Sequence, residues 1–334
     1  METVLVLLGS MALVFLAAVI FVNAIEYIGF RLRLGGSFVG AIIAPLFTSF
    51  PEMTVFLVAL FAHGGEAGEK IGIGTVFGQP FMASSFSFGL VGLMVLIGFL
   101  LGRRDDTVLE VDRVLIIPFA VINICFPLVL IPAIWPGEAL RHFMGFVFVA
   151  AFIIYIWIMY RKKRVEIIED AAEPYVCRVI PQSLEAPLPW AFVQSVGATV
   201  LLYIGSHAMV GSVDLLARGL GISPLGLAII IVPAATAIPE TSTALIWSFR
   251  GKDTLSVASL VGENALYSTF YPALGMFLTT WALDVHAYLS VAANVVISLI
   301  ILYFLVIRRL PWWGLCLGFI FFTAYAILVF AYHI

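Results

Sequence analysis

Ten long apolar runs with few charges constrain this chain more than any other feature. A helix needs about 20 apolar residues to cross the hydrocarbon core of a bilayer. Runs of roughly that length or longer occupy residues 3–23, 36–62, 71–101, 114–134, 140–160, 188–210, 222–248, 255–281, 285–307 and 311–332. Hydrophobic residues make up 63% of the chain and charged residues 11%, against roughly 45 to 50% and 25% in soluble domains. The sequence therefore predicts an all-α polytopic membrane protein with about ten transmembrane helices.

The basic residues lie almost entirely on one side of this predicted arrangement. If the helices alternate in direction, 14 of the 17 Lys and Arg residues fall in loops on one side, and only Lys70, Arg141 and Arg218 fall on the other. Cytoplasmic loops of membrane proteins are enriched in Lys and Arg. We therefore expect a protein of the plasma (inner) membrane with both termini outside and the loop of residues 161–187 in the cytoplasm.

That central loop divides the chain into two parts with five predicted helices each, residues 1–160 and 188–334. It opens with four basic residues, Arg161 to Arg164, and continues with scattered acidic residues and prolines. The basic cluster could bind anionic lipid headgroups or a regulator, but the orientation of the chain alone accounts for it. We expect residues 161–187 to be a linker.

A nine-residue motif recurs in the two parts at a constant offset of 188 residues. Residues 44–52 read Ala-Pro-Leu-Phe-Thr-Ser-Phe-Pro-Glu, and residues 232–240 read Val-Pro-Ala-Ala-Thr-Ala-Ile-Pro-Glu. Because five predicted helices separate the copies, the two copies enter the membrane from opposite sides. Inverted repeats with interrupted helices that meet near the bilayer midplane are typical of secondary transporters. We therefore expect two inverted five-helix repeats with helices broken at mid-depth.

The motif carries oxygen ligands into apolar surroundings. A carboxylate at the position of Glu52 or Glu240 costs about 2.5 to 3.5 kcal/mol in the membrane unless something compensates for its charge. Each proline before a glutamate removes the donor to the carbonyl four residues earlier, and hydroxyls stand nearby at Thr48, Ser49 and Thr236. Hard cations such as Ca²⁺ prefer such oxygen ligands. Proline kinks with Ser and Thr are common in membrane helices, but the matching glutamates favour a cation site.

A weaker match follows each motif, at an offset of 184 residues. Gly78-Gln79 corresponds to Gly262-Glu263, which adds an amide and a third carboxylate to the candidate ligands. Glu263 could complete the coordination of a cation, exchange a proton, or form a structural hydrogen bond to a neighbouring helix. These three roles stay open from the sequence.

The motifs resemble the alpha repeats of the sodium/calcium exchanger family, within the cation/calcium exchanger superfamily, whose signature is close to Gly-Thr-Ser-x-Pro-Glu in each half. The chain looks like a divergent, prokaryotic-type member. The resemblance implies ten helices, a site formed by the second, third, seventh and eighth, and sliding of the first and sixth during alternating access. It also implies that Glu52 and Glu240 bind the divalent ion, with backbone oxygens near Thr48 and Thr236 assisting.

The chain departs from the family pattern at several ligand positions. Ala237 replaces a Ser that helps to bind sodium in the family, Gln79 and Glu263 stand where Ser is expected, and Ala83 and Tyr267 replace Asn or Asp. These changes imply fewer sodium sites or a proton as the counter-ion. The Gly-Asn-x-x-Glu pattern of the proton/calcium branch is absent, so the resemblance is to the sodium/calcium branch.

We therefore expect a Na⁺/Ca²⁺ antiporter that works by alternating access, without enzymatic activity, cofactor, nucleic acid or nucleotide. Its transported partners would be Ca²⁺ and Na⁺ or H⁺, within a lipid bilayer. The expected ligand set comprises Glu52, Glu240, Thr48, Thr236, Ser49, Glu263 and Gln79. The alternatives are exchange of Ca²⁺ or another cation for protons, a cation channel, and a membrane metalloenzyme, for which the sequence supplies no nucleophile or metal-activating His near the glutamates.

Overall fold

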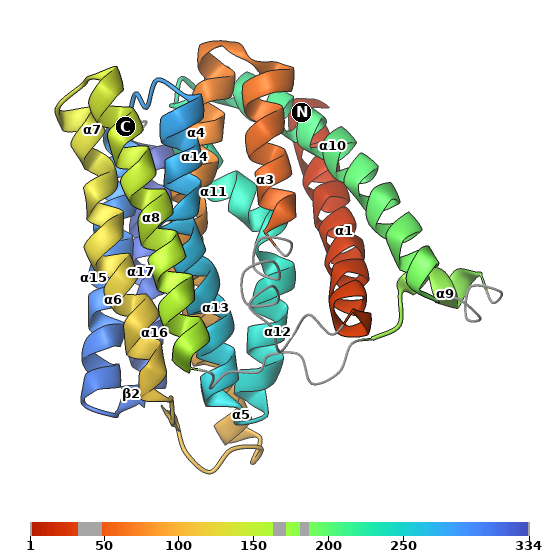
Figure 1. Ribbon diagram of the computed structural model, residues 1–334, viewed down its shortest axis with the longest axis vertical. Coiled ribbons are helices and arrows are strands. Elements are labelled where there is room, and N and C mark those ends of the chain that lie inside the picture. The colour runs from red at the N-terminus through yellow and green to blue at the C-terminus, as the bar shows by residue number, and fades with distance from the viewer. Residues whose placement is uncertain (1, 33–48, 163–171, 181–186, 333–334) are drawn as a thin grey trace.

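The computed structural model describes residues 2–32, 49–162, 172–180 and 187–332, and nearly all of them are helical (Figure 1). In this part of the chain, seven helical stretches are long and apolar enough to cross a membrane. Four of them are single helices: α1 (Glu2–Arg31), α8 (Glu138–Lys162), α10 (Pro187–Leu220) and α15 (Val285–Val306). Two more are α4 (Gly65–Met82) continued through the π-helical turn η3 (Ala83–Ser87) into α5 (Phe88–Leu100), and α16 (Trp312–Cys316) followed by α17 (Gly318–Ala331). The last consists of η4 (Arg113–Leu115), α6 (Ile116–Cys125), η5 (Phe126–Leu130) and α7 (Ile131–Ile134). The prediction of an all-α polytopic membrane protein is confirmed.

Shorter helices occupy the other three predicted crossings. They are α3 (Phe50–Leu57) with the π-helical turn η2 (Val58–His63), α11 (Pro224–Thr236) followed by α12 (Ile238–Phe249), and α13 (Asp253–Tyr267) followed by α14 (Phe270–Leu278). Helix α3 begins inside the first motif, at Phe50, and α11 and α12 are interrupted inside the second motif, at Ala237. The change from α3 to η2 after Leu57 and the break between α13 and α14 after Tyr267 lie outside the motifs. A short helix α9 (Tyr175–Val179) lies in the central segment.

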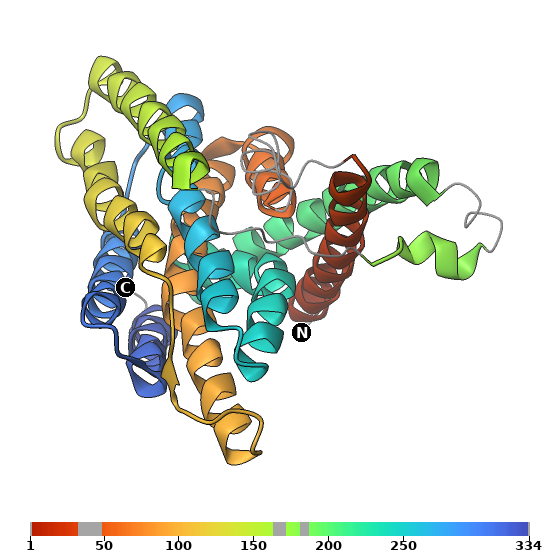
Figure 2. The same ribbon diagram turned by 60° about the horizontal axis from the view of Figure 1, so that its bottom comes forward.

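The two halves of the chain do not form separate domains, because helices of one half pack against helices of the other. Helix α1 packs along α10, α4 along α11, α8 against α14, and α5 against α16. Figure 2 shows α1 and α10 on one side of the molecule and α6, α8, α15 and α17 on the other. Helices α3, α4 and α11 to α13 lie between these groups (Figure 1). The interrupted helices therefore occupy the interior of the molecule.

Glycines allow the closest of these approaches, between α4 and α11. A Cβ added at Gly74 would lie 2.7 Å from both the Ala228 Cβ and the Leu225 carbonyl oxygen, and one at Gly78 would lie 2.8 Å from the Ile229 carbonyl oxygen. Small residues spaced four apart let helix backbones approach in membranes. This contact holds the third predicted crossing against the seventh.

A buried ion pair joins the two halves at one end of the molecule. Arg104 follows α5, and Asp253 opens α13; Nη1 of the arginine lies 2.6 Å from the carboxylate, and the two side chains are 5% and 6% exposed. Asp253 also accepts a hydrogen bond from the Glu110 N–H at 2.9 Å. Nearby, the short strands β1 (Val108–Leu109) and β2 (Leu310–Pro311) pair antiparallel.

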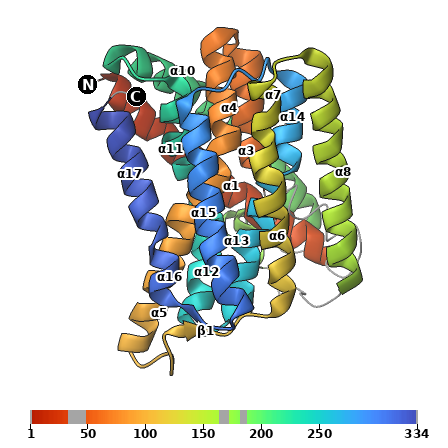
Figure 3. The same cartoon turned by 90° about the vertical axis from the view of Figure 1, so that its left-hand side faces the viewer.

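Both chain ends lie at the opposite end of the molecule (Figures 1 and 3). The other end of the molecule holds the C-terminal ends of α1 and α5 and the β1 to β2 pair. These segments carry much of the basic charge. This distribution is compatible with the predicted orientation, in which the basic end faces the cytoplasm.

We predict that Arg104→Met lowers stability by about 3–5 kcal/mol, because removal of one partner leaves Asp253 as a buried, uncompensated charge. Thermal unfolding of the purified protein in detergent measures the effect. Arg103→Met is the matched control, since Arg103 is exposed. Equal unfolding midpoints for the two variants would contradict a structural role for the ion pair.

We also predict that Gly74→Val separates α4 from α11 and costs about 1–3 kcal/mol through overpacking. Gly197→Val is the control, because a Cβ added at Gly197 would meet nothing within 4 Å outside the backbone of its own helix. The ratio of folded to aggregated protein in size-exclusion chromatography after heating reports the difference. A Gly74→Val variant as heat-resistant as the control would show that the close approach is not needed.

Candidate cation site

The two motif glutamates stand at the beginnings of two half-length helices. Helix α3 runs from the middle of the molecule toward the end that carries the termini, and α12 runs from the middle toward the other end (Figure 1). Glu52 lies in the first turn of α3, after Pro51, and Glu240 takes the third position of α12, after Pro239. The N-terminus of a helix carries partial positive charge, which favours a nearby carboxylate. The arrangement directs two helix N-termini toward mid-depth.

The prolines have a different local role from the one expected. Both Pro51 and Pro239 occupy the first turn of a helix, where the N–H that proline lacks has no partner within the helix anyway. They therefore begin helices rather than break hydrogen bonds inside them. Pro233 does lie inside a helix, near the end of α11.

The Glu52 carboxylate is the most unusual group in the described interior. Its side chain is 0% exposed, and neither carboxylate oxygen has a hydrogen-bond partner among the described residues. A buried carboxylate without such partners carries a large free-energy cost unless a proton or a cation neutralises it. The position is therefore suited to bind a positive ion or a proton.

Three further side chains lie near enough to influence the charge of this carboxylate, although none of them forms a hydrogen bond of normal geometry with its oxygens. They are the hydroxyls of Thr236 in α11 and Tyr267 in α13 and the carboxylate of Glu263, also in α13. Thr236 and Tyr267 are 2% and 1% exposed, whereas Glu263 is half-buried. The fold thus brings a motif residue of each half, together with Glu263, to one place.

Gln79 meets the second motif directly. Its Nε2 donates a 2.8 Å hydrogen bond to Thr236 Oγ1, and Thr236 Oγ1 donates to the Val232 carbonyl at 3.2 Å. The Gln79 Oε1 atom has no partner within the described residues. Gln79 therefore orients the Thr236 hydroxyl and leaves an amide oxygen for a ligand.

The remaining predicted residues are only partly described. Ser49 is buried at the N-terminal boundary of α3, and its carbonyl accepts a 2.6 Å hydrogen bond from the Tyr271 hydroxyl. Thr48 lies outside the described residues. Glu240 is placed by its backbone in α12, and its side chain is not among those described. The meeting of the two glutamates thus stays a prediction.

Tyr267, Tyr271 and Asn264 also lie in this region, although they are not part of the ligand set predicted from the sequence. Asn264 Nδ2 donates to Asn294 Oδ1 of α15 at 3.2 Å, and Ser268 Oγ donates to Asn264 Oδ1 at 3.2 Å. These residues surround the interruption between α13 and α14. The offset of 184 pairs Ser84-Ser85 in the π-helical turn η3 with Ser268-Thr269 at this interruption. It pairs Asn264, Tyr267 and Tyr271 with Pro80, Ala83 and Ser87, so the repeat gave no signal for these three residues.

The described residues include no group of three or more His, Cys, Asp and Glu side chains arranged to hold a metal ion. Carbonyl, hydroxyl and amide oxygens are suitable ligands for Ca²⁺ and other hard cations. The interior around Glu52 offers these groups at Ser49, Thr236 and Gln79.

Comparisons with known proteins agree with this architecture. The crystal structure of the H⁺/Ca²⁺ exchanger CAX superposes with a TM-score of 0.74 at 19% identity, over 99% of this chain and 85% of that one. The structure of native YfkE gives 0.69 at 14% identity, over 98% and 92%. The sodium-calcium exchanger NCX_Mj, soaked with 10 mM Na⁺ and zero Ca²⁺, gives 0.58 at 19% identity, over 98% and 97%. At these identities the likeness shows a shared fold.

No curated protein matches the sequence. The sequence profile of the family described as sodium/calcium exchanger protein, however, matches residues 2–161 and 190–332, which is most of the chain. This agrees with the resemblance carried by the two motifs. The chain therefore belongs to the sodium/calcium exchanger protein family.

Proposed function

We propose that this protein is a secondary-active antiporter that moves Ca²⁺ across the plasma membrane in exchange for another cation. The observation that carries the proposal is the Glu52 carboxylate, which is fully buried without a hydrogen-bond partner among the described residues. Such a group is stable in a membrane interior when it is neutralised. A carboxylate that alternates between two neutralising partners couples their movements.

In this proposal Ca²⁺ binds between the N-termini of α3 and α12. Glu52 and Glu240 supply the negative charge, and oxygens of Thr48, Ser49, Thr236 and Gln79 complete the coordination. Residues 1–160 and 188–334 act as two inverted repeats around this position, joined by the linker of residues 161–187. Because Glu52, Thr236 and Gln79 come from both repeats, a relative movement of the repeats opens the site to one side at a time.

The moving element we propose is the pair α1 and α10, which pack along one another. Helix α10 also packs on α3 and α11, and α1 on α11, so a shift of the pair changes access to both motif helices. With the basic loops in the cytoplasm and the termini outside, one of the alternating openings faces each side of the membrane.

For the counter-ion we propose H⁺. A proton needs only a carboxylate, and the site offers Glu52 with Glu263 acting on it. The hydroxyl and amide ligands expected for sodium are replaced at Ala237, Tyr267 and Ala83.

Sodium is the second candidate, and it was the first expectation from the sequence. It is favoured by the Thr48-Ser49-x-Pro51-Glu52 motif and by the absence of the Gly-Asn-x-x-Glu pattern. The two candidates share the calcium site and differ only in what replaces the calcium ion.

We predict that Glu52→Gln and Glu240→Gln each reduce Ca²⁺ uptake to background, because the neutral amide removes charge that the divalent ion requires. Uptake of radioactive Ca²⁺ into proteoliposomes measures this, with size-exclusion profiles to show that the variants fold. Glu66→Gln is the matched control, since Glu66 is an exposed residue paired with Lys70 at 2.7 Å. Normal uptake by Glu240→Gln would contradict the shared site.

The counter-ion is tested in the same proteoliposomes. We expect an outward proton gradient to drive Ca²⁺ uptake without sodium, and an outward sodium gradient at equal pH to drive none. Glu263→Gln should alter the dependence of uptake on pH, because it removes a carboxylate that acts on Glu52. If uptake requires sodium and does not respond to the pH gradient, the counter-ion is Na⁺ and not H⁺. The proposed calcium site would be unaffected by that result.

A further inference from the structure

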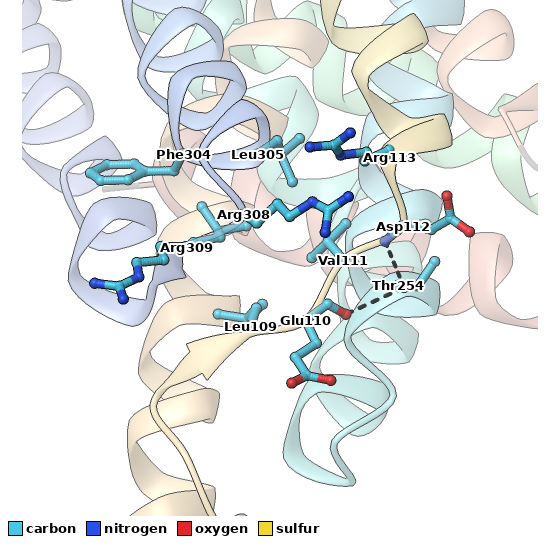
Figure 4. Close-up of a pocket in the computed structure, with 11 residues that line it drawn as sticks. Leu109, Glu110, Val111, Asp112, Arg113, Thr254, Phe304, Leu305, Arg308 and Arg309 are labelled. Carbon is cyan, nitrogen blue, oxygen red and sulfur yellow. Dashed lines mark hydrogen bonds between the residues drawn. The ribbon is translucent and has the colours of Figure 1, made fainter.

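A polar cavity lies beside the β1 to β2 pair, at the basic end of the molecule, and Figure 4 shows the residues that line it. Its volume is about 620 Å³. Two stretches form its walls, residues 109–113 before α6 and residues 304–310 at the end of α15, and Thr254 of α13 closes it. Neither transport motif contributes to this cavity.

Three arginines line the cavity: Arg113, Arg308 and Arg309. The guanidinium groups of Arg113 and Arg308 point toward one another, whereas that of Arg309 points outward (Figure 4). None of the three forms an ion pair with a described residue. Two converging cations repel each other, so this arrangement is favourable when an anion lies between them.

The two carboxylates of the cavity do not supply that anion. Asp112 accepts a hydrogen bond from the Val114 N–H at 2.9 Å and so caps the following helical turn. The Glu110 side chain points away from Arg113 and Arg308 (Figure 4). The charge facing the interior of the cavity is therefore positive.

The walls are fixed by backbone interactions. Arg308 has a left-handed backbone, with φ at 57°, a conformation that costs free energy in a residue other than glycine and persists where the surroundings impose it. The Arg309 N–H donates to the Phe304 carbonyl at 3.0 Å. On the other wall, Thr254 Oγ1 accepts from the Asp112 N–H at 3.1 Å. The guanidinium groups therefore extend from a preformed frame.

The position of the cavity indicates an amphiphilic ligand. It lies where α15 leaves the apolar region, and the next residues of that helix end, Val306 and Ile307, are 53% and 44% exposed. These exposed apolar side chains lie outside the cavity, while Phe304 and Leu305 line the cavity itself. Because α15 is a candidate membrane span that ends at Val306, we infer that an anion held here lies at the depth of lipid headgroups.

We propose that this cavity binds the phosphate of an anionic phospholipid from the adjoining leaflet. Guanidinium groups bind phosphate oxygens through paired, charge-assisted hydrogen bonds, and basic pockets between membrane helices bind anionic headgroups. Arg113 and Arg308 hold the phosphate, and Phe304 and Leu305 contact the first part of the acyl chains. The lipid joins the end of α15 to the segment that leads into α6.

Native mass spectrometry of the full-length protein in detergent tests this site. The probes are phosphatidylglycerol, phosphatidylcholine as the zwitterionic comparison, and inorganic phosphate. For the unaltered protein we expect one retained phosphatidylglycerol that an excess of phosphatidylcholine or inorganic phosphate does not displace. Displacement by phosphatidylcholine, or by inorganic phosphate alone, would overturn the assignment to an anionic lipid.

For the Arg113→Gln, Arg308→Gln double variant we expect retention of phosphatidylglycerol to fall by about tenfold or more, since each arginine near an anionic surface contributes to binding. The matched control is Arg103→Gln, an exposed arginine outside the cavity, which should retain the lipid. Arg308→Lys keeps the charge and loses the paired hydrogen bonds, so partial retention is expected. Equal retention by the double variant and the control would overturn the proposal.

Discussion

The structure depends on one constraint, which is that a carboxylate cannot stay charged and unpartnered in a membrane interior. Glu52 is buried in the first turn of α3 without a hydrogen-bond partner among the described residues. Its position at a helix N-terminus provides partial compensation, and Thr236 and Tyr267 bring hydroxyl groups toward it. A neutralising ion or proton provides the rest in the function that we propose.

This constraint accounts for the interrupted helices. A helix that crossed the membrane without interruption would place its N-terminal N–H groups at the surface, whereas a half-length helix places them at mid-depth. Helices α3 and α12 begin there and run in opposite directions (Figure 1). Backbone that is not helical at this depth is tolerated only inside the protein or along a polar cavity. The uninterrupted helices α1, α10, α15 and α8 surround the broken ones and supply that protection.

The same logic of buried charge applies at the basic end, with different outcomes. Arg104 and Asp253 neutralise each other inside the protein and join the two halves of the chain. Arg113 and Arg308 converge without a described carboxylate between them, and so direct positive charge into a cavity at the end of α15. The first arrangement is complete within the chain, and the second is suited to a ligand from outside it.

The sequence by itself determined the class of fold and the family, because both depend on local patterns. Apolar runs long enough to span a bilayer identify membrane helices without knowledge of their packing, and the Pro-Glu motifs mark where α3 and α12 begin. Tertiary structure decided which polar groups meet. That Gln79 donates to Thr236, that Tyr267 and Glu263 act on Glu52, and that Tyr271 binds the Ser49 carbonyl follow from the packing of α3, α4, α11 and α13. Residues more than 150 positions apart meet only when helices pack, and the sequence carries no local signal of that contact.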